Sequence, residues 1–416
     1  MTMAFHEPMQ TLFSGDPPKA EPCRRDGMPD DGCFVTTEKV GRMGIVNQGV
    51  VFQGEANTDR SSACFPSICV LPTGRWLCAF RISPKKADAF PQNVAVCRSD
   101  DEGRSWSTPA QPFHAPPIRG VAGAFRVAQL TALGGRRAAA VLYWVDASDP
   151  ILPFFNEQTE GLLDSRIFLT FSEDGGENWS TPRLLDTTPY TMPTPITGPI
   201  LPLANGEWAL QFETNKTYHD TSVWRHASVL MFSRDGGRTW PEHVKVFEDP
   251  DARFFHWDQR PSVLPDGTIL DVFWSFDRGE ARYLNIHARS SRDHGRTWSP
   301  LWDTGVPGQP APVVPLSDGK LALVYVDRTT APKIAIRISR DGGKSWPAAT
   351  ERTIYDSALS AQERNKNTMQ DAWSEMSAFS VGLPYTARLG DGDVLAVFYA
   401  GPSTHHTAIR WVHIHP

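Results

Sequence analysis

The sequence predicts an all-β fold, a six-bladed β-propeller of four-stranded antiparallel blades, and two repeated patterns carry that prediction. The first is an octet, SRDGGRTW at residues 233–240, with relatives that begin at residues 99, 172, 291 and 339. The second is a hairpin, two apolar runs joined by a tight turn, which occurs six times, most weakly at residues 126–144. From residue 42 the chain is a series of short, β-branched runs without a long helical stripe.

The spacing of the octets fits one four-stranded unit for each octet. Successive octets start 73, 61, 58 and 48 residues apart, each after a strand-like run. The last unit, residues 383–416, shows three strands and no octet, so we expect MGIVNQGVVF at residues 43–52 to supply its fourth strand and close the ring. The predicted organisation is an irregular arm, residues 1–41, followed by a single propeller domain, residues 42–416.

Composition argues against several classes of partner. The formal net charge of the 416 residues is −6, and no run of Lys and Arg marks a nucleic-acid or membrane surface. No apolar run reaches the roughly 18–20 residues of a membrane span. The N-terminus lacks the pattern of a secretory signal, so we expect a cytoplasmic location, or secretion if a signal was removed from the chain.

The cysteines and histidines give no sign of a metal centre. All six cysteines lie in the first quarter of the chain, and Cys69, Cys78 and Cys97 fall in strand-like runs, which favours small buried side chains over a disulfide framework. No zinc-type CxxC pair occurs, and the pair His405 and His406 lacks a third ligand. We therefore predict no metal and no cofactor.

The order of strands within a unit decides which end of the propeller can hold a site. The hairpin turns join the first strand to the second, and the octets join the third to the fourth, so both lie at one end. The octet has a structural role: its Asp accepts hydrogen bonds from backbone N–H groups of the turn, and its Trp packs under the turn. We therefore expect functional residues at the opposite end, at the starts of first strands and the ends of second strands.

The octet has the form S-x-D-x-G-x-[ST]-W, and its five copies resemble the Asp-box, or bacterial neuraminidase repeat, of the sialidase superfamily. The resemblance covers nearly the whole chain beyond residue 42. It implies an exo-glycoside hydrolase that acts on a terminal acidic or unusual sugar of a glycan. It also implies a retaining mechanism with an Asp as acid/base and a Tyr as nucleophile.

The same resemblance places the catalytic candidates. AFRISPKKADAF resembles the stretch in which an Arg closes the second strand and a loop Asp acts as acid/base, which implies these roles for Arg81 and Asp88. FHWDQRPSVL places Asp258 as the carboxylate that activates the nucleophile, with Glu213 as the alternative. GLPYTARLGDG offers Tyr385 as the nucleophile, two residues later than the resemblance would put it.

Sugar-binding candidates surround these positions. The arginine expected before the first hairpin is replaced by Cys64 in CFPSI, which argues against sialic acid itself as the substrate. Other cationic and aromatic side chains could bind an acidic sugar at the same face: Arg81, Arg126, Arg260, Arg328, His256 and Trp257. Further aromatic residues that could stack on sugar rings are Trp144, Phe154, Phe155, Trp224, Trp274, Trp373 and Tyr399.

Strand alternation would put Asp258 and Arg260 on one side of their strand and Trp257 and Gln259 on the other. The pair Asp258 and Arg260 could equally be an ion pair that joins neighbouring blades.

Two other functions fit the pattern. One is a polysaccharide lyase on uronate-containing glycans, in which a Tyr or His removes a proton that an Arg-bound carboxylate acidifies. The other is a non-catalytic carbohydrate-binding or scaffold propeller.

Overall fold

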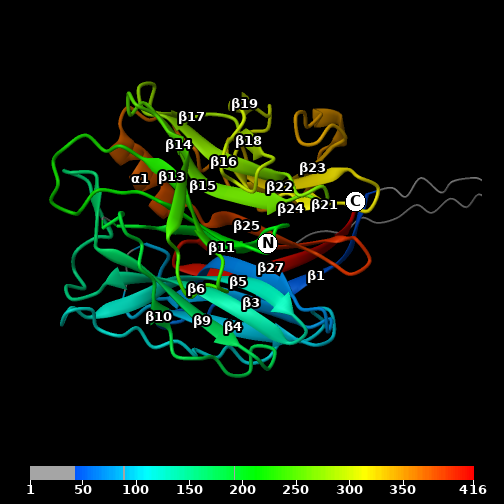
Figure 1. The fold of residues 1–416 in the computed structure, drawn as a ribbon, viewed down its shortest axis with the longest axis horizontal. Helices are drawn as coiled ribbons and strands as arrows, with labels where there is room; N and C mark the ends of the chain where they lie inside the picture. The colour runs from blue at the N-terminus through cyan, green and yellow to red at the C-terminus, as the bar shows by residue number, and fades with distance from the viewer. Residues whose placement is uncertain (1–42, 88–89, 192) are drawn as a thin grey trace, which may run out of the picture. The chain divides into compact units, whose positions relative to one another are not determined.

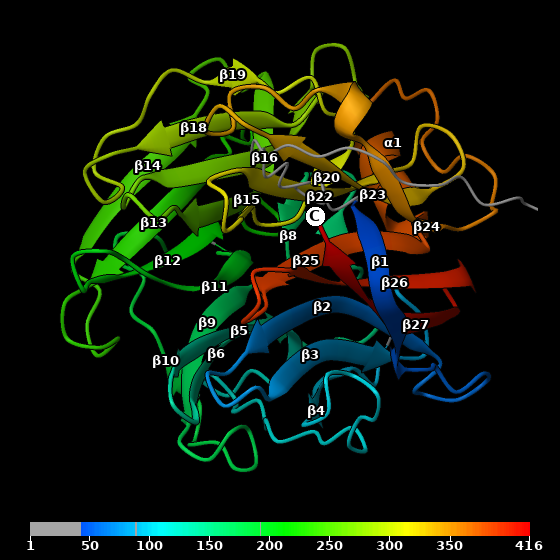
Figure 2. The ribbon, with the colours of Figure 1, turned by 90° about the vertical axis from the view of Figure 1, so that its right-hand side faces the viewer.

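Antiparallel β-sheets make up nearly all of the regular structure in the computed structural model, which describes residues 43–87, 90–191 and 193–416 (Figure 1). The predicted arm, residues 1–41, lies outside the described residues. Arg42–Pro416 form one unit by their internal contacts. The all-β prediction is confirmed, and the sheets have a propeller-like arrangement with their first strands towards a common centre (Figure 2).

Four sheets follow the predicted order of strands from the centre outwards. The first contains β5 (Gly123–Gly134), β6 (Arg137–Asp146), β9 (Ser165–Ser172) and β10 (Arg183–Leu184). The second contains β11 (Ile196–Pro202), β12 (Trp208–Glu213), β13 (Ala227–Ser233) and β14 (Glu242–Glu248). The third contains β15 (Phe254–Val263), β16 (Ile269–Asp277), β17 (Arg282–Tyr283), β18 (His287–Ser291) and β19 (Trp302–Asp303). The fourth contains β20 (Gln309–Pro310), β21 (Val314–Pro315), β22 (Leu321–Asp327), β23 (Lys333–Ser339) and β24 (Arg352–Asp356).

A seven-stranded sheet joins the two ends of the described chain. Its strands are β1 (Gly44–Phe52), β2 (Ser62–Val70), β3 (Trp76–Ser83), β4 (Asn93–Ser99), β25 (Val381–Arg388), β26 (Val394–Ser403) and β27 (His406–His415). As expected, β1 pairs antiparallel with β27 along almost its whole length. Strand pairing therefore gives four separate four- or five-stranded sheets, one larger sheet and a small two-stranded sheet, where the sequence predicted six separate blades. The reason is a single parallel pairing, Ser62 with Thr407, which connects β2 to β27.

The five octets all connect a third strand to the segment that follows it, and their hydrogen bonds explain their composition. In the octet at 233–240, Ser233 Oγ donates to Asp235 Oδ1 and accepts from the Gly237 N–H, both at 2.8 Å. Asp235 also accepts from the Thr239 N–H at 2.9 Å, and Trp240 Nε1 donates to the Gly237 carbonyl at 3.2 Å. The octet is thus a self-contained turn, which is the structural role predicted for it.

The first strands are interrupted by β-bulges near their starts. Pairing shifts register between Cys64 and Ser67 in β2, between Trp257 and Arg260 in β15, and between Gly382 and Tyr385 in β25. One residue within each bulge has positive φ: Phe65 (57°), Asp258 (50°) and Leu383 (42°). A bulge turns an extra side chain away from the ladder, and φ in this range is costly for residues other than glycine. These three side chains face the centre of the ring.

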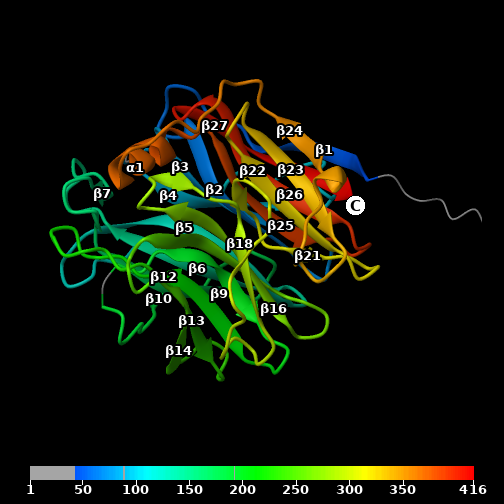
Figure 3. The same ribbon diagram turned by 90° about the horizontal axis from the view of Figure 1, so that it is seen from above.

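One α-helix, α1 (Met369–Ala378), lies in the connection between β24 and β25 and was not predicted. Thr368 and Asp371 form a capping box at its start, a signal that is readable in the sequence TMQD. Trp373 on α1 stacks on Phe155 of the short strand β7 (Phe155–Asn156), with ring centroids 4.2 Å apart and planes 10° apart. β7 pairs with β8 (Gly161–Leu162), and both α1 and β7 lie at the same side of the sheets (Figure 3). A 3₁₀ helix, η1 (Ala348–Thr350), precedes β24.

The core lies between neighbouring sheets and includes the cysteines predicted to be buried. Cys64, Cys69, Cys78 and Cys97 are all buried and free. Burial raises the pKa of Cys69 to about 12. Within the described ranges, no helix is long and apolar enough to cross a membrane.

Candidate functional site

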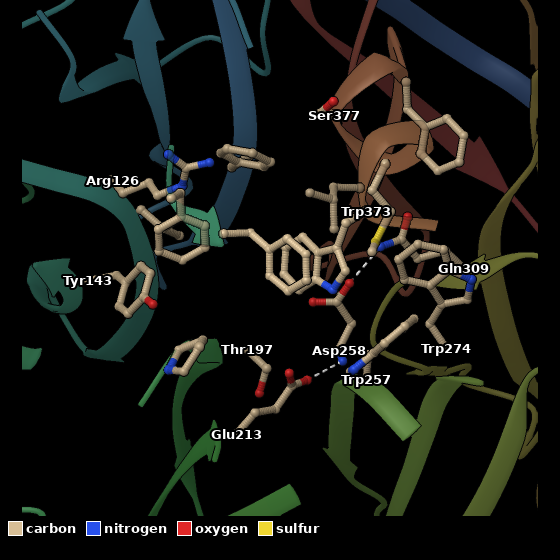
Figure 4. A pocket seen from close by; sticks show the side chains of 18 of the residues that line it. Arg126, Tyr143, Thr197, Glu213, Trp257, Asp258, Trp274, Gln309, Trp373 and Ser377 are labelled. Atoms are coloured by element: carbon tan, nitrogen blue, oxygen red, sulfur yellow. Dashed lines mark hydrogen bonds between the residues drawn. The ribbon is translucent and has the colours of Figure 1, made fainter. Parts of the chain in front are cut away.

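A cavity of about 440 Å³ opens at the centre of the propeller (Figure 4). Its walls come from the starts of first strands and the ends of second strands, with α1 along one side. None of the octet residues lines it. The strand polarity read from the sequence therefore identified the end of the propeller that carries the cavity.

Seven of the ten residues predicted for the site line this cavity: Arg126, Glu213, Trp257, Asp258, Arg260, Arg328 and Tyr385. Two others, Arg81 and His256, are buried behind its wall. Asp88 lies outside the described residues. The sequence predicted Trp257 on the opposite side of its strand from Asp258 and Arg260. This prediction was wrong, because the bulge in β15 lets all three side chains face the cavity.

Asp258 is a partly exposed carboxylate at the cavity wall, with 26 % of its side chain exposed. Gln309 Nε2 donates to Asp258 Oδ2 at 2.5 Å, and Arg260 Nη2 lies 3.4 Å from Asp258 Oδ1. The backbone N–H of Asp258 donates to the carboxylate of Glu213. Asp258 has a positive φ within the bulge, a conformation that is unfavourable for this residue type and needs support from its surroundings. The hydrogen bond from its N–H to Glu213, on β12, supplies that support.

Glu213, at the end of β12, is a buried carboxylate behind Asp258. His226 Nε2 lies 3.4 Å from Glu213 Oε2. Burial raises the pKa of Glu213; the contact with His226 opposes the rise, and the nearby charge of Asp258 adds to it. Two carboxylates with such different surroundings suit two different proton-transfer roles.

Two of the three arginines are fixed by backbone carbonyls. Arg260 Nη1 donates to the Thr197 carbonyl, and Arg328 Nε donates to the Val381 carbonyl at 2.8 Å. Arg328 Nη2 also donates to Gln309 Oε1 at 2.9 Å, so Gln309 links Arg328 to Asp258. Arg328 Nη1 is buried and has no hydrogen-bond partner among the described residues. A buried donor of this kind favours a ligand that brings an acceptor.

The third arginine, Arg126, lies against aromatic rings at the opposite wall. Its guanidinium carbon is 4.5 Å from the Phe154 ring centroid and 5.8 Å from that of Phe65. The bulge in β5 between Phe125 and Val127 directs Arg126 into the cavity. Arg126, Arg260 and Arg328 thus reach the cavity from three different sheets.

Tyr385, at the bulge of β25, is buried at the cavity wall. Burial raises its pKa, and the charge of Arg260 opposes the rise. In the described part of the chain, no hydrogen bond connects its hydroxyl to Asp258 or Glu213. Leu383 occupies the position two residues earlier, where the resemblance would place a tyrosine, and it too lines the cavity.

Arg81 holds the loop that follows β3. Its guanidinium donates to the carbonyls of Lys85 and Lys86 and, at 3.2 Å, to Gln92 Oε1. It also lies 4.7 Å from the Phe65 ring centroid. These contacts place Arg81 beneath the loop, where it can position cavity residues without lining the cavity itself.

His256 is enclosed by protein on the far side of β15. Its Nδ1 lies 2.7 Å from Ser275 Oγ, and its ring packs edge-on against Phe247 at a centroid distance of 4.2 Å. Burial and the nearby His287 hold the pKa of His256 well below its ordinary value, so the ring is neutral. The side chain points away from the cavity because the bulge begins only at the next residue.

Sequence reasoning missed Lys86, which lines the cavity although it is 6 % exposed. Its ammonium donates to the Met376 carbonyl of α1 and lies 5.6 Å from the ring centroids of both Phe379 and Tyr399. Burial lowers the pKa of Lys86 to about 7, and the charges of Arg328, Arg81 and Arg126 also lower it. Its position beside Lys85 gave no signal that one lysine is buried and the other is not.

Aromatic side chains form the wall of the cavity next to α1. Of the aromatics expected from the sequence, six line the cavity: Phe154, Phe155, Trp224, Trp274, Trp373 and Tyr399. Trp144 is buried elsewhere and donates to the Pro116 carbonyl at 3.0 Å. Trp257 and Trp373 have buried indole N–H groups without a hydrogen-bond partner among the described residues. The wall thus offers flat apolar surface and free donors together, which suits sugar rings.

Residues 124–395 match the family model described as the BNR repeat-like domain. The match covers more than half of the sequence and includes the site residues from Arg126 to Tyr385. Phe65, Arg81 and Lys86 lie before it, and Tyr399 lies after it. The chain belongs to the BNR repeat-like domain family. This family membership rests on the sequence and agrees with the octet pattern and with the propeller-like sheets.

Known proteins extend the comparison of this BNR repeat-like chain. A sialidase of Micromonospora viridifaciens is 32% identical over 142 residues, which are 32% of this chain and 21% of the relative. The alignment therefore spans about a fifth of that relative's length. A protein of Dyadobacter fermentans DSM 18053, described as of unknown function, superposes with a TM-score of 0.69 at 18% identity, covering 89% of this chain and 98% of the other.

A second solved structure, the NanB sialidase of Streptococcus pneumoniae, superposes with a TM-score of 0.58 at 15% identity. The superposition covers 88% of this BNR repeat-like chain and 70% of the sialidase. At such identities the likeness establishes the fold and supports a propeller for this chain.

Proposed function

We propose that this protein is a sialidase-like exo-glycoside hydrolase that acts on a terminal acidic sugar of a glycan. The observation that carries the proposal is the continuous chain of contacts from Arg260 through Asp258 and Gln309 to Arg328 on one cavity wall, opposite Arg126. Guanidinium groups orient the carboxylate of an acidic sugar, and the carboxylate of Asp258, held between Arg260 and Gln309, can act as a base at the same wall.

The proposed chemistry is a two-step displacement with retention. Tyr385 Oη attacks the anomeric carbon while Asp258, or Glu213 behind it, takes the phenolic proton, and the bond to the leaving oxygen breaks. Asp88 gives that oxygen its proton and then takes a proton from the water that releases the sugar from the tyrosine. As the bond between the sugar and Tyr385 breaks, the carboxylate returns the phenolic proton to Tyr385 Oη. Because the pKa of Tyr385 is raised by burial, the attack needs this carboxylate base.

We further propose that the ring has six blades. The seven-stranded sheet divides at the Ser62 and Thr407 pairing into β25, β26, β27 and β1 on one side and β2, β3 and β4 on the other. An isolated bridge between Val96 and Ala110 adds a short fourth strand to the second group. Each group then has the order of a single blade.

The test is hydrolysis of a panel of aryl glycosides and oligosaccharides that carry acidic terminal sugars. The expected result is release of one acidic sugar, with retained anomeric configuration by proton NMR. Asp258→Asn, Tyr385→Phe and Asp88→Ala should each lower kcat by at least about a hundredfold with an unchanged circular dichroism spectrum. Unchanged rates in Asp88→Ala and Tyr385→Phe would remove the assigned mechanism.

A second candidate is a non-catalytic carbohydrate-binding propeller. It is favoured by Tyr385, whose hydroxyl makes no hydrogen bond to Asp258 or Glu213 within the described residues. The same panel separates the two: a binder retains the acidic glycan in isothermal titration calorimetry and releases no product. An unsaturated product that absorbs in the ultraviolet would instead indicate a lyase.

A further inference from the structure

The last unit of the ring departs from the others at the end opposite the cavity. In five units, an octet with its Ser and Asp follows the third strand. In the last unit the third strand, β27, ends with His413 and His415, and the turn before β26 contains Asp391 and Asp393. In the last unit, two carboxylates and two imidazoles therefore lie where each of the other five units has an octet.

These four side chains converge. His413 Nε2 lies 2.9 Å from Asp393 Oδ2 and 3.9 Å from Asp391 Oδ2, and His415 Nδ1 lies 2.7 Å from Asp393 Oδ1. One ligand atom each from Asp391, Asp393 and His413 lie within 4.8 Å of one another. His413 and His415 share a face because side chains alternate along a strand. Asp391 Oδ1 accepts from the Asp393 N–H at 3.0 Å, which leaves Asp391 Oδ2 for His413.

The two carboxylates of the cluster have no Lys or Arg partner among the described residues to balance their negative charge. The partners of Asp391 and Asp393 are the two histidines. The side chains of His413 and Asp393 are 14 % and 10 % exposed, whereas those of Asp391 and His415 are 59 % and 57 % exposed. The cluster thus has a sheltered inner pair and an open outer pair, through which an ion can enter.

We propose that Asp391, Asp393 and His413 bind a Zn²⁺ ion, with His415 as a fourth ligand. Zn²⁺ takes imidazole nitrogen and carboxylate oxygen at about 2.0–2.2 Å, so the ligand atoms of Asp391, Asp393 and His413 reach one ion after small side-chain rotations. His415 lies outside this group of three and contacts Asp393 Oδ1. Imidazole ligands favour Zn²⁺ over Ca²⁺ and Mg²⁺, which prefer oxygen. The turn hydrogen bond that Asp391 accepts from the Asp393 N–H also occurs at Asp266 and Asp318 in other hairpin turns. What distinguishes the last turn is the pair of imidazoles that contact its carboxylates.

A bound ion would cross-link the turn between β25 and β26 to the end of β27. β27 also pairs with β1, where His413 lies opposite Asn47 and His415 opposite Gly44. The ion would therefore fasten the corner at which the last unit meets the strand from the start of the described chain. Its binding energy adds to the stability of the folded state, because the unfolded chain does not hold the ligands together.

The test is titration of the chelator-treated full chain with ZnCl₂ in isothermal titration calorimetry at pH 7.5, with CaCl₂ in a parallel experiment. The expected result is one Zn²⁺ per chain, no saturable binding of Ca²⁺, and a melting temperature raised by about 3–5 °C at saturating Zn²⁺. His413→Gln and Asp391→Asn should each weaken Zn²⁺ binding at least about tenfold and reduce the thermal shift.

The matched control is His114→Gln, which removes an exposed histidine far along the chain and should bind as the original protein does. If His413→Gln does not fold, Asp391→Asn decides the question, because its side chain is largely exposed. Zn²⁺ binding that is only millimolar, or that is equally strong in Asp391→Asn and the control, would overturn the proposal. The cavity is not involved, so this result is independent of the glycosidase test.

Discussion

Gln309 Nε2 donates a hydrogen bond to Asp258 Oδ2 at 2.5 Å, and the other end of the same amide accepts from Arg328. The amide therefore fixes a carboxylate and a guanidinium at a set separation without letting them neutralise each other in a direct ion pair. Its orientation follows from chemistry, because only the NH₂ group can donate to Asp258 and only the oxygen can accept from Arg328. Gln309 was not among the residues predicted for the site.

We expect Gln309→Ala to lower kcat/KM for the acidic substrate by about ten- to a hundredfold, since each lost hydrogen bond to a charged group is worth about 1.5–3 kcal/mol. Asp258 and Arg328 would both lose a positioning contact. Steady-state kinetics on the substrate found by the panel measures the effect. Gln48→Ala, at an exposed position on β1, is the control and should leave the rate unchanged. Equal rates for both variants would show that Gln309 positions nothing.

Gly382 gives a second test of the cavity wall, because a Cβ at this position would lie 2.0 Å from Arg328 Nη2 and 2.9 Å from the Tyr399 hydroxyl. Gly382→Ala should displace the Arg328 guanidinium and weaken binding of an acidic glycan by at least about tenfold. Calorimetry measures the affinity. Gly390→Ala is the matched control, since nothing lies within 4 Å of its added Cβ. Wild-type affinity in Gly382→Ala would mean that Arg328 does not contact the ligand.

The arrangement of strands could be predicted because the repeats report it directly. The octets mark the ends of third strands, the hairpin turns mark the ends of first strands, and together they locate the cavity at the opposite end. The pairing of β1 with β27 followed from counting strands in the last unit. The merged sheet could not be foreseen, because one pairing between Ser62 and Thr407 decides it.

The details of the cavity depend on contacts between units, which a repeat does not record. A bulge brings Trp257 to the same face as Asp258 and Arg260, and no residue type in HWDQR indicates it. Lys86 is buried because α1 covers it, and the two segments are far apart in the sequence. By contrast, the capping box at Thr368 and Asp371 is a local signal, so the start of α1 could have been predicted from the sequence.

The octets predict how the protein responds to acid. Hydrogen bonds from the backbone and side chain of Asn178 lower the pKa of Asp174 to about 2. A carboxyl group whose pKa is lower in the folded state than the ordinary value of about 3.9 stabilises the fold above pH 4. That contribution is lost as the pH falls from about 4 to 2. Asp174→Asn should therefore reduce the fall in unfolding free energy over this interval, measured by urea denaturation.

The control for the octet is Asp59→Asn, at an exposed position outside any octet, which should follow the wild-type pH dependence. Activity on the glycan should be the same in both variants at pH 7, because no octet residue lines the cavity. A loss of activity in folded Asp174→Asn would contradict the assignment of the octets to structure alone.

Lys86 should make stability depend on pH near neutrality, with the opposite slope to that expected for a lysine in an ion pair. Its pKa is about 7 in the folded protein and about 10.4 in an unfolded chain, so the unfolded state binds more protons between these values. The unfolding free energy should therefore rise with pH from about 7 to 10. In Lys86→Met this rise should be smaller, and the variant should be most stable relative to the wild type below pH 7.

Urea denaturation at pH 6, 7, 8 and 9 measures the difference, with Lys85→Met as the control from the same loop. Parallel curves for Lys86→Met and the wild type would show that the ammonium is not buried in the folded protein.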